Sequence, residues 1–303
     1  MRWLATYILK GPMQAMAVMT VTGLLSLSLP PLSLLLGYLG GGAVALVTLQ
    51  VGPRHGLLAL LGAQIAAALL GGLLLGLPAP AWLMAVAGWV PVWLAATLLH
   101  MSRSLALALQ GLMVLGLAAV MAVYLLVDDP AALWRGELSQ VFHTLVQAGV
   151  IQADEQLDML ITAVARLFTG GLTGYAMVGA AVTLFIGRGW QAMLFHPGAF
   201  RAEFEQMRYA RPVGLLFVAL AAGAVLMEGE LLANLALVML LGYLFHGLAV
   251  IYGVLAKRRA SAAWLVGLYV VMAFALPEMM FVLGLLGLVD TFVDFRSRVK
   301  ARP

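Results

Sequence analysis

The chain is a succession of long apolar runs separated by short breaks of proline, glycine and charged residues. The runs are continuous, and most are long enough for a membrane-crossing helix of about 20 residues. Strands of a membrane barrel would instead show segments of about 10 residues with alternating polarity. The pattern therefore predicts an all-α, polytopic bundle of transmembrane helices. The candidate spans are 13–29, 32–52, 57–76, 82–99, 105–127, 171–187, 213–227, 231–256, 260–276 and 279–295.

The last two candidate spans come from a single apolar run, 260–295, which Pro277 and Glu278 interrupt. The run is too long for one span. As a hairpin of two short spans it places Glu278 at a membrane surface, whereas a single span buries that carboxylate. The hairpin gives about ten spans in all, and eight or nine remain as alternatives.

The basic residues favour the hairpin. With ten spans and the N-terminus inside, all 17 lysines and arginines except Arg135 and Arg166 fall on the cytoplasmic side. A single final span would export the basic tail residues. Because cytoplasmic loops carry an excess of lysine and arginine, we expect both termini in the cytoplasm of a bacterial inner membrane. The tail residues are Arg296, Arg298, Lys300 and Arg302.

Two segments between spans have helical periodicity. In 128–168, apolar residues recur at three and four positions on both sides of a break near Gly149. We predict one or two amphipathic helices on the outer surface, lying on the bilayer or capping the bundle. In 188–212, a turn at Pro197-Gly198 precedes a short interfacial helix with aromatic and ion-paired faces. A solvated connector is the alternative for this second segment.

Composition agrees with a membrane location. Hydrophobic residues make up 64% of the 303 residues and charged residues only 10%, against about 25% in a soluble domain. Cysteine is absent, which excludes disulfides, thiolate metal sites and a cysteine nucleophile.

The motifs of common catalytic sites are missing. The glycine-rich stretch 37–42 lies inside a span and lacks the Lys-Ser/Thr of a phosphate-binding loop, so we interpret it as helix packing. Pairs four apart, such as Gly72 with Gly76 and Gly170 with Gly174, also predict close helix approach. No charged residue falls near the centre of a span, which argues against a proton-coupled pump. We expect no enzyme, no metal and no cofactor.

Uncharged polar residues inside the spans are the remaining candidates for a ligand site. Several of them together could hold a small neutral or amphiphilic molecule, although serine and threonine also bond within their own helix. The candidate binding residues are Thr22, Ser26, Gln64, Trp89, Asn234, Tyr243 and His246.

The C-terminal residues predict an anchor at the inner end of the last span. Asp290 and Asp294 lie four apart, and Asp294 lies four before Arg298, a spacing that allows an ion pair across one helical turn. Asp290 is left for a backbone N–H or for the basic loop at 257–259. Alternatively, Arg296 and the rest of the basic tail only contact anionic lipid.

Three stretches resemble the YybS-like family of bacterial membrane proteins of unknown function. They are Phe195–Phe204 (FHPGAFRAEF), Leu286–Arg296 (LGLVDTFVDFR) and the break at Pro30–Leu34 (PPLSL). This family is in turn similar to the S components of energy-coupling-factor transporters, which bind vitamins and other micronutrients within the membrane. The resemblance implies an S-component-like N-terminal membrane half.

These observations predict a membrane half at 1–127, an outer helical segment at 128–168 and a second membrane half at 169–303. The expected function is binding, or helping to transport, a small uncharged or amphiphilic substrate. A scaffold that recruits cytoplasmic or envelope partners is the alternative, and an intramembrane enzyme ranks third. Expected partners are the bilayer, a small-molecule ligand, and a membrane-protein partner or second copy, but not nucleic acid.

Overall fold

The computed structural model describes residues 1–76, 79–152 and 154–299, and these residues form helices with no strand. The helices are α1 (Arg2–Ile8), α2 (Pro12–Ser28), the 3-10 helix η1 (Pro30–Leu32), α3 (Ser33–Gln50), α4 (Pro53–Leu75), α5 (Ala79–Ser102), α6 (Leu105–Leu126), α7 (Pro130–Gln147), α8 (Glu155–Phe195), α9 (Ala199–Gln206), α10 (Arg211–Met227), α11 (Glu230–Lys257), α12 (Ala263–Phe274), α13 (Leu276–Val293) and α14 (Phe295–Arg298). The all-helical class predicted from the sequence is confirmed.

The breaks between apolar runs are helix starts. Proline occupies one of the first two positions of α2, α4, α7, α10 and α13, where its missing N–H leaves no hydrogen bond unmade. Other starts carry side-chain caps: Asp129 accepts from the backbone N–H of Ala132 at 2.9 Å, and Asp154 accepts from that of Leu157 at 2.8 Å.

Ten helices correspond to the ten candidate spans, namely α2 to α6, α8 and α10 to α13. Within the described residues, six helices are long and apolar enough to cross a membrane, and α9 with α10, bent by 56°, makes a seventh. The helices α2 and α12 are apolar but shorter. The protein is thus a multi-span membrane protein, while the total of ten stays a prediction.

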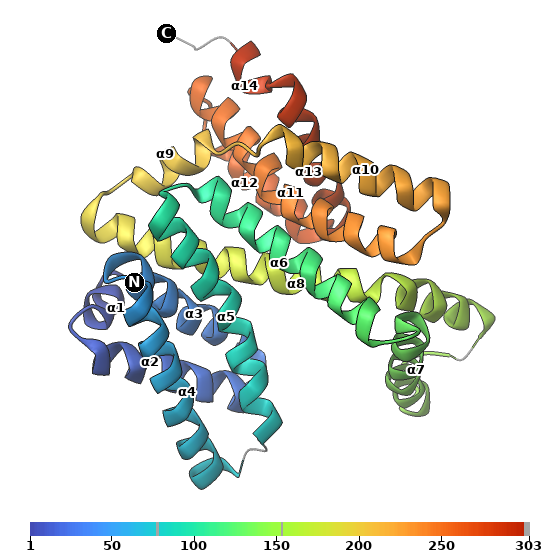
Figure 1. The fold of residues 1–303 in the computed structure, drawn as a ribbon, viewed down its shortest axis with the longest axis horizontal. Helices are drawn as coiled ribbons and strands as arrows, with labels where there is room; N and C mark the ends of the chain where they lie inside the picture. Colours follow the sequence, from blue (N-terminus) through green and yellow to red (C-terminus); the bar gives the residue numbers. More distant parts are fainter. Residues whose placement is uncertain (77–78, 153, 300–303) are drawn as a thin grey trace.

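No helix break separates the predicted outer segment from the predicted span at 171–187, and the division near residue 169 stays a prediction. Helix α8 runs unbroken for 41 residues, from the outer segment through the expected span 171–187 and on to Phe195 (Figure 1). Gly170 and Gly171 do not interrupt it, because Gly170 packs against the backbone of Asn234 in α11. The break near Gly149 is confirmed, and Gly149 has φ 71°.

Helix α7 packs against the first turns of α8, so the helical state predicted for 130–168 is confirmed. Trp134 donates its indole N–H to the Thr169 hydroxyl at 2.8 Å and packs on Phe168 with the rings tilted and their centroids 4.8 Å apart. Arg135 pairs with Asp158 at 3.0 Å.

The short helix predicted after Pro197-Gly198 is α9. Phe200 and Phe204 both pack on Phe185 of α8, and Arg201 pairs with Glu205 on the other face at 2.7 Å. The aromatic face therefore points into the bundle.

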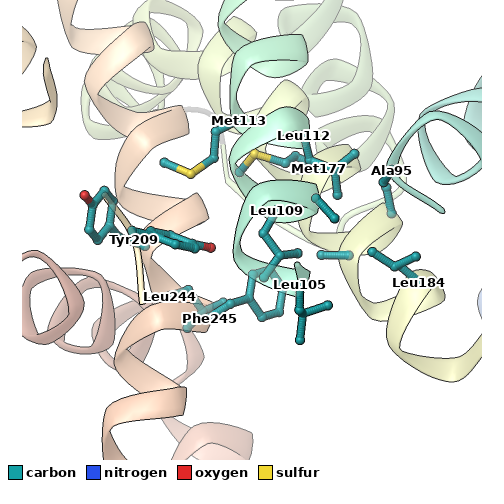
Figure 2. Packing of buried hydrophobic residues seen from close by; sticks show 14 of the residues in the cluster. Ala95, Leu105, Leu109, Leu112, Met113, Met177, Leu184, Tyr209, Leu244 and Phe245 are labelled. Atoms are coloured by element: carbon teal, nitrogen blue, oxygen red, sulfur yellow. The ribbon is translucent and has the colours of Figure 1, made fainter. Parts of the chain in front are cut away.

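Two apolar clusters hold the bundle together. The larger joins α5, α6, α8 and α11, where Leu109, Met113, Leu184 and Phe245 are buried side by side (Figure 2). The smaller joins α1 to α5 and α8 around Trp89 and Trp190. The glycine-rich stretch 37–42 lies in α3 of this cluster, with Gly40 against Trp89 and Gly41 against Thr183, so its packing role is confirmed.

The predicted close approach of small residues holds in part. Gly170 and Gly174 both pack against α11, whereas among the described atoms none lies within 4 Å of where a side chain would begin at Gly72 or Gly76. Close packing needs a neighbouring helix beside the two small residues. The four-residue spacing in the sequence does not show whether one is there.

The run 260–295 is broken, as predicted, and the break is at Ala275 (φ −131°, ψ 52°). Helices α11 and α13 run in the same direction, because Leu240 packs on Gly284, Tyr243 on Gly287, and Gly253 on Arg296. The intervening segment with α12 must therefore return along α11 before α13 begins. The ends of α11 and α13 lie together, since the Lys257 ammonium donates to the Arg296 carbonyl at 2.7 Å.

The basic residues gather at one end of the molecule. In Figure 1, α1 and α9 lie on the left, α14 lies at the top, and α7 lies on the right. Arg188, Arg208 and Arg296 belong to the α9 end, whereas Arg135 and Arg166 pair with Asp158 and Glu230 near α7. This agrees with the predicted partition of these charges between two faces; Lys300 and Arg302 lie outside the described residues.

Candidate functional site

The predicted polar residues of the first membrane half are mostly occupied by local hydrogen bonds. The Thr22 hydroxyl donates to the Val18 carbonyl of its own helix at 2.7 Å, and the Ser26 hydroxyl to that of Gly23 at 2.7 Å. Thr22 and Trp89 both contact the Gly40 position.

Trp89 and Gln64 differ in whether their polar side-chain groups are hydrogen-bonded. The Trp89 indole N–H donates to the Gly37 carbonyl at 3.1 Å. Gln64 is buried, and its amide nitrogen has no hydrogen-bond partner among the described residues. The hydroxyl oxygens of Thr97 and Tyr243 are likewise buried without a partner among the described residues. Polar groups left this way are ones that a ligand could satisfy.

Asn234 joins three helices. Its side-chain oxygen accepts from the Gly170 N–H at 2.6 Å, and its nitrogen donates to the Arg166 carbonyl at 2.7 Å and to the Tyr124 hydroxyl at 3.0 Å. It is fully buried. These bonds tie α6, α8 and α11 together, which is a structural role and leaves no amide group for a ligand.

Tyr243 and His246 lie together in α11, with ring centroids 5.9 Å apart, and Tyr209 packs on both. The structure thus distributes the predicted binding residues over three places: the α2–α5 half, the Asn234 contact and the Tyr243–His246 region. They do not converge on one pocket.

The strongest polar cluster centres on Asp290, near the end of α13. Its Oδ2 atom accepts from the Arg296 guanidinium at 2.9 Å and lies 3.3 Å from His246 Nε2, and its Oδ1 atom accepts from the Phe295 N–H at 2.8 Å. The side chains of His246, Asp290 and Arg296 are 0%, 2% and 4% exposed. Charges buried to this degree must be paired.

Arg296 also reaches across to α9. It donates to the Glu205 carbonyl at 3.0 Å and to the Met207 carbonyl at 2.7 Å. These are the last carbonyls of α9, which have no partner within the helix. The cluster therefore fastens α9, α11, α13 and α14 to each other, and the role of Asp290 as an anchor of the inner end stays a prediction.

The predicted ion pair between Asp294 and Arg298 is wrong. Helix α13 ends at Val293, and Asp294 adopts φ 51°, so the two residues do not follow one helix. Asp294 pairs with Arg208 at 2.6 Å, and Arg298 donates to the Val293 carbonyl at 3.0 Å. The reversal at Asp294 also carries Arg296 back toward Asp290.

His246 lies between Thr291 and the Asp290–Arg296 pair. Its Nδ1 atom is 3.4 Å from the Thr291 hydroxyl, which also donates to the Gly287 carbonyl at 3.1 Å. Its Nε2 atom is 3.3 Å from both Arg296 Nη2 and Asp290 Oδ2. The imidazole therefore contacts both members of the buried ion pair.

Outside the spanning helices, Asp294 has a perturbed pKa. Burial alone would raise the pKa of this carboxyl, but the hydrogen bonds from Arg208 and from the Ser297 N–H, with the positive charge of Arg208, lower it overall. Within the described residues, no group of three or more histidine, aspartate and glutamate side chains could hold a metal ion.

A cavity of about 390 Å³ lies between α1, α2, α3 and α4. Its walls are almost entirely apolar, with Met16, Val47 and Leu58 among them, and His55 is the one ionisable side chain in the lining. Such a volume is within the range of small-molecule sites, and apolar walls suit a hydrocarbon chain.

A family of sequences described as predicted membrane proteins (DUF2232) matches residues 17–291. The chain belongs to the DUF2232 family. No curated protein and no solved structure matches it. The matched range of this DUF2232 protein contains His246 and Asp290, whereas α1 and Arg296 lie beyond it.

The sequence of this DUF2232 protein gives no sign of the α1–α4 cavity, because almost all of the residues that line it are apolar. The lining residues have the pattern of an ordinary apolar helix surface. This pattern is the same whether neighbouring helices pack closely or leave a cavity between them. The Asp290 cluster was found in part, through the charge at the end of the last apolar run.

Proposed function

We propose that this protein is a non-enzymatic integral membrane protein that binds, or helps to move, a small amphiphilic molecule. The observation that carries the proposal is the α1–α4 cavity, whose apolar walls would hold a hydrocarbon portion while His55 and the exposed Arg54 lie near its polar end. An uncharged polar substrate is less well supported, because the polar residues expected to bind it are spread over three places.

The proposal includes a topology of ten spans in a bacterial inner membrane, with both ends in the cytoplasm. It is supported by the grouping of basic residues at the α1, α9 and α14 end, since lysine and arginine are in excess on the cytoplasmic side. The YybS-like motifs and the likeness to S components support a substrate-binding role within the membrane, as an analogy.

One observation favours the alternative function, a membrane scaffold. The interior around Asn234, Tyr243 and His246 is filled, and Asn234 is fully hydrogen-bonded to the protein. A filled bundle with a firmly held basic end would present a constant surface to cytoplasmic partners.

The two functions can be separated with a photoreactive palmitate analogue added to the protein in nanodiscs. We expect saturable crosslinks to Met16 and Leu58 of the cavity wall. Leu58→Trp should fill the cavity and reduce crosslinking severalfold. Leu61→Trp is the matched control, because Leu61 lies on the same helix, is 45% exposed and does not line the cavity.

Equal crosslinking of the two tryptophan variants would mean that the probe reports only lipid around the protein. The amphiphile-binding proposal would then be wrong, and the scaffold would become the leading function.

A further inference from the structure

A second cavity, separate from the apolar one, opens where the ends of α3, α5, α8 and α9 meet. It has a volume of about 180 Å³. Two leucines form part of its wall, and the remaining lining is polar. The polar residues are His100, Arg103, Arg188, Gln191 and Glu203. None of them was a candidate in the sequence, because each lies outside the predicted spans.

Arg188 is held in place at this cavity. Its Nε atom donates to Glu203 at 2.9 Å and its Nη1 atom to Gln191 at 2.7 Å. Gln191 in turn donates to the Leu49 carbonyl at 3.2 Å. Within the described chain, Nη2 of Arg188 donates to no protein acceptor, so a fixed guanidinium retains N–H groups for an anion.

His100 presents its second nitrogen. The Leu49 carbonyl lies 3.1 Å from His100 Nδ1 and can only accept, so Nδ1 carries the proton. The Nε2 atom is left for another partner. Two arginines and one glutamate give the lining a net positive charge even with His100 neutral, and the Leu49 carbonyl is already satisfied by His100 and Gln191.

Arg103 has a backbone conformation that does not favour arginine. It follows α5 with φ 56°, the left-handed conformation that helix ends usually give to glycine. Its side chain is exposed and forms no ion pair or side-chain hydrogen bond among the described residues. An arginine in a strained position at the edge of a cavity points to a role in binding.

We propose that this cavity binds a phosphate group, carried either by an anionic lipid or by a small soluble phosphate. Arg103 and Arg188 supply planar N–H groups that match phosphate oxygens. His100 adds a third N–H only when its Nε2 is protonated as well, because a neutral Nε2 can only accept. The site lies at the basic end of the molecule, and basic pockets between helices on the cytoplasmic side bind lipid headgroups. It goes beyond the proposed amphiphile cavity, with which it shares only α3.

The test exploits the backbone at Arg103. Arg103→Gly removes the guanidinium but suits the left-handed conformation, so the melting temperature without ligand should equal or exceed that of the wild type. Arg103→Asn is a second variant that tolerates the same backbone. Arg259→Gly is the matched control, because Arg259 is an exposed arginine with φ 48° outside this cavity.

The full-length protein in uncharged detergent is titrated with inorganic phosphate against sodium chloride of equal ionic strength. It is titrated separately with dioleoyl phosphatidylglycerol against dioleoylglycerol, which has the same chains and no phosphate. Bound ligand raises the melting temperature. We expect Arg103→Gly and Arg103→Asn to weaken phosphate-dependent binding about ten- to hundredfold, as for a lost charged hydrogen bond, and Arg259→Gly to bind like the wild type.

The two titrations distinguish the sources. A saturable shift with phosphatidylglycerol alone assigns the site to a lipid, a shift with phosphate alone assigns it to a soluble ligand, and a shift with both assigns it to the phosphate group itself. The proposal is overturned if the wild type shows no saturable shift in either titration. Equal weakening by Arg103→Gly and Arg259→Gly overturns it as well, because general electrostatic attraction would then explain the binding.

Discussion

At the scale of single residues, burial separates charges that the sequence presents as equivalent. Asp290 and Asp294 lie four positions apart in similar surroundings. The side chain of Asp290 is 2% exposed and holds a buried arginine, whereas that of Asp294 is 34% exposed and pairs with an arginine that is 52% exposed. Removing the Asp290 carboxylate should leave the buried Arg296 charge without its partner, whereas removing the Asp294 carboxylate should leave only the exposed Arg208 unpaired.

We therefore expect Asp290→Asn to destabilise the protein by about 3 kcal/mol, since breaking a buried ion pair leaves its partner uncompensated. Asp294→Asn should change stability by less than about 1 kcal/mol, as for an exposed pair. Thermal unfolding of the two variants in detergent measures both effects. Equal melting temperatures for the two variants would contradict the difference in burial.

The lowered pKa of Asp294 predicts a small acid sensitivity. Its folded pKa lies below the ordinary value near 4. Its contribution to stability is therefore fully present above that ordinary value and is lost as the pH falls through the lower, folded pKa. The wild type should lose more stability than Asp294→Asn between about pH 5 and pH 2. Parallel melting curves across this range would show that the Arg208 contact contributes nothing.

The sequence predicted that Asp290 is an anchor but paired its neighbours wrongly. Helical spacing from Asp294 to Arg298 assumes that one helix contains both, and the left-handed backbone at Asp294 breaks that assumption. Non-glycine residues seldom adopt this conformation, so the pattern gave no sign of it. His246 was predicted as a polar residue inside a span, whereas the residues that contact it could be identified only from the structure.

At the scale of helices, α8 shows why the ends of a helix are harder to predict than the presence of a helix. The amphipathic start and the apolar continuation differ in composition, and this difference predicted two elements. One helix serves both, because its first turns contact α7 and its later turns contact α3 and α11. The surroundings change along the helix, while its hydrogen bonding does not.

The contact between α8 and α11 gives a test with a neighbouring control. A side chain at Gly170 would collide with backbone atoms of Asn234, whereas at Gly171 the nearest atom is 4.0 Å away, in the flexible side chain of Leu237. We expect Gly170→Ala to destabilise the protein by about 1–3 kcal/mol through overpacking. Gly171→Ala should stabilise it by up to about 1 kcal/mol, because alanine favours helix.

Thermal unfolding of the two alanine variants measures the difference. If both variants melt at the wild-type temperature, α8 and α11 are not packed as closely as the Asn234 contact indicates.

At the scale of the whole molecule, the parallel course of α11 and α13 fixes which loops share a face. Lys257 and Arg296 are hydrogen-bonded, so the loop after α11 and the tail after α13 must lie on one side of the membrane. Charge counting from the sequence reached the same grouping, because basic residues follow the sides of a membrane whatever the packing between spans. The distribution of basic residues could not predict that α11 and α13 pack against each other.

The absence of cysteine from the chain allows a direct test of this topology. Single substitutions Ser261→Cys and Ser297→Cys should react with a membrane-impermeant maleimide from the same side. Gln140→Cys in α7 should react only from the opposite side. Labelling of intact and inside-out vesicles gives the answer, and opposite reactivity of positions 261 and 297 would exclude the parallel arrangement.

The short helix α12 has a mechanical consequence for the surrounding lipid. Its 12 residues extend about 18 Å, while the hydrocarbon layer is about 30 Å thick. If α12 crosses the membrane, as the proposed ten-span topology requires, the bilayer beside it would become thinner, at a cost that grows with each ångström of mismatch. We expect the protein to be more stable in nanodiscs of dilauroyl lipid than of dioleoyl lipid. Membrane thickness would then act on this protein as a physical variable, without any bound ligand.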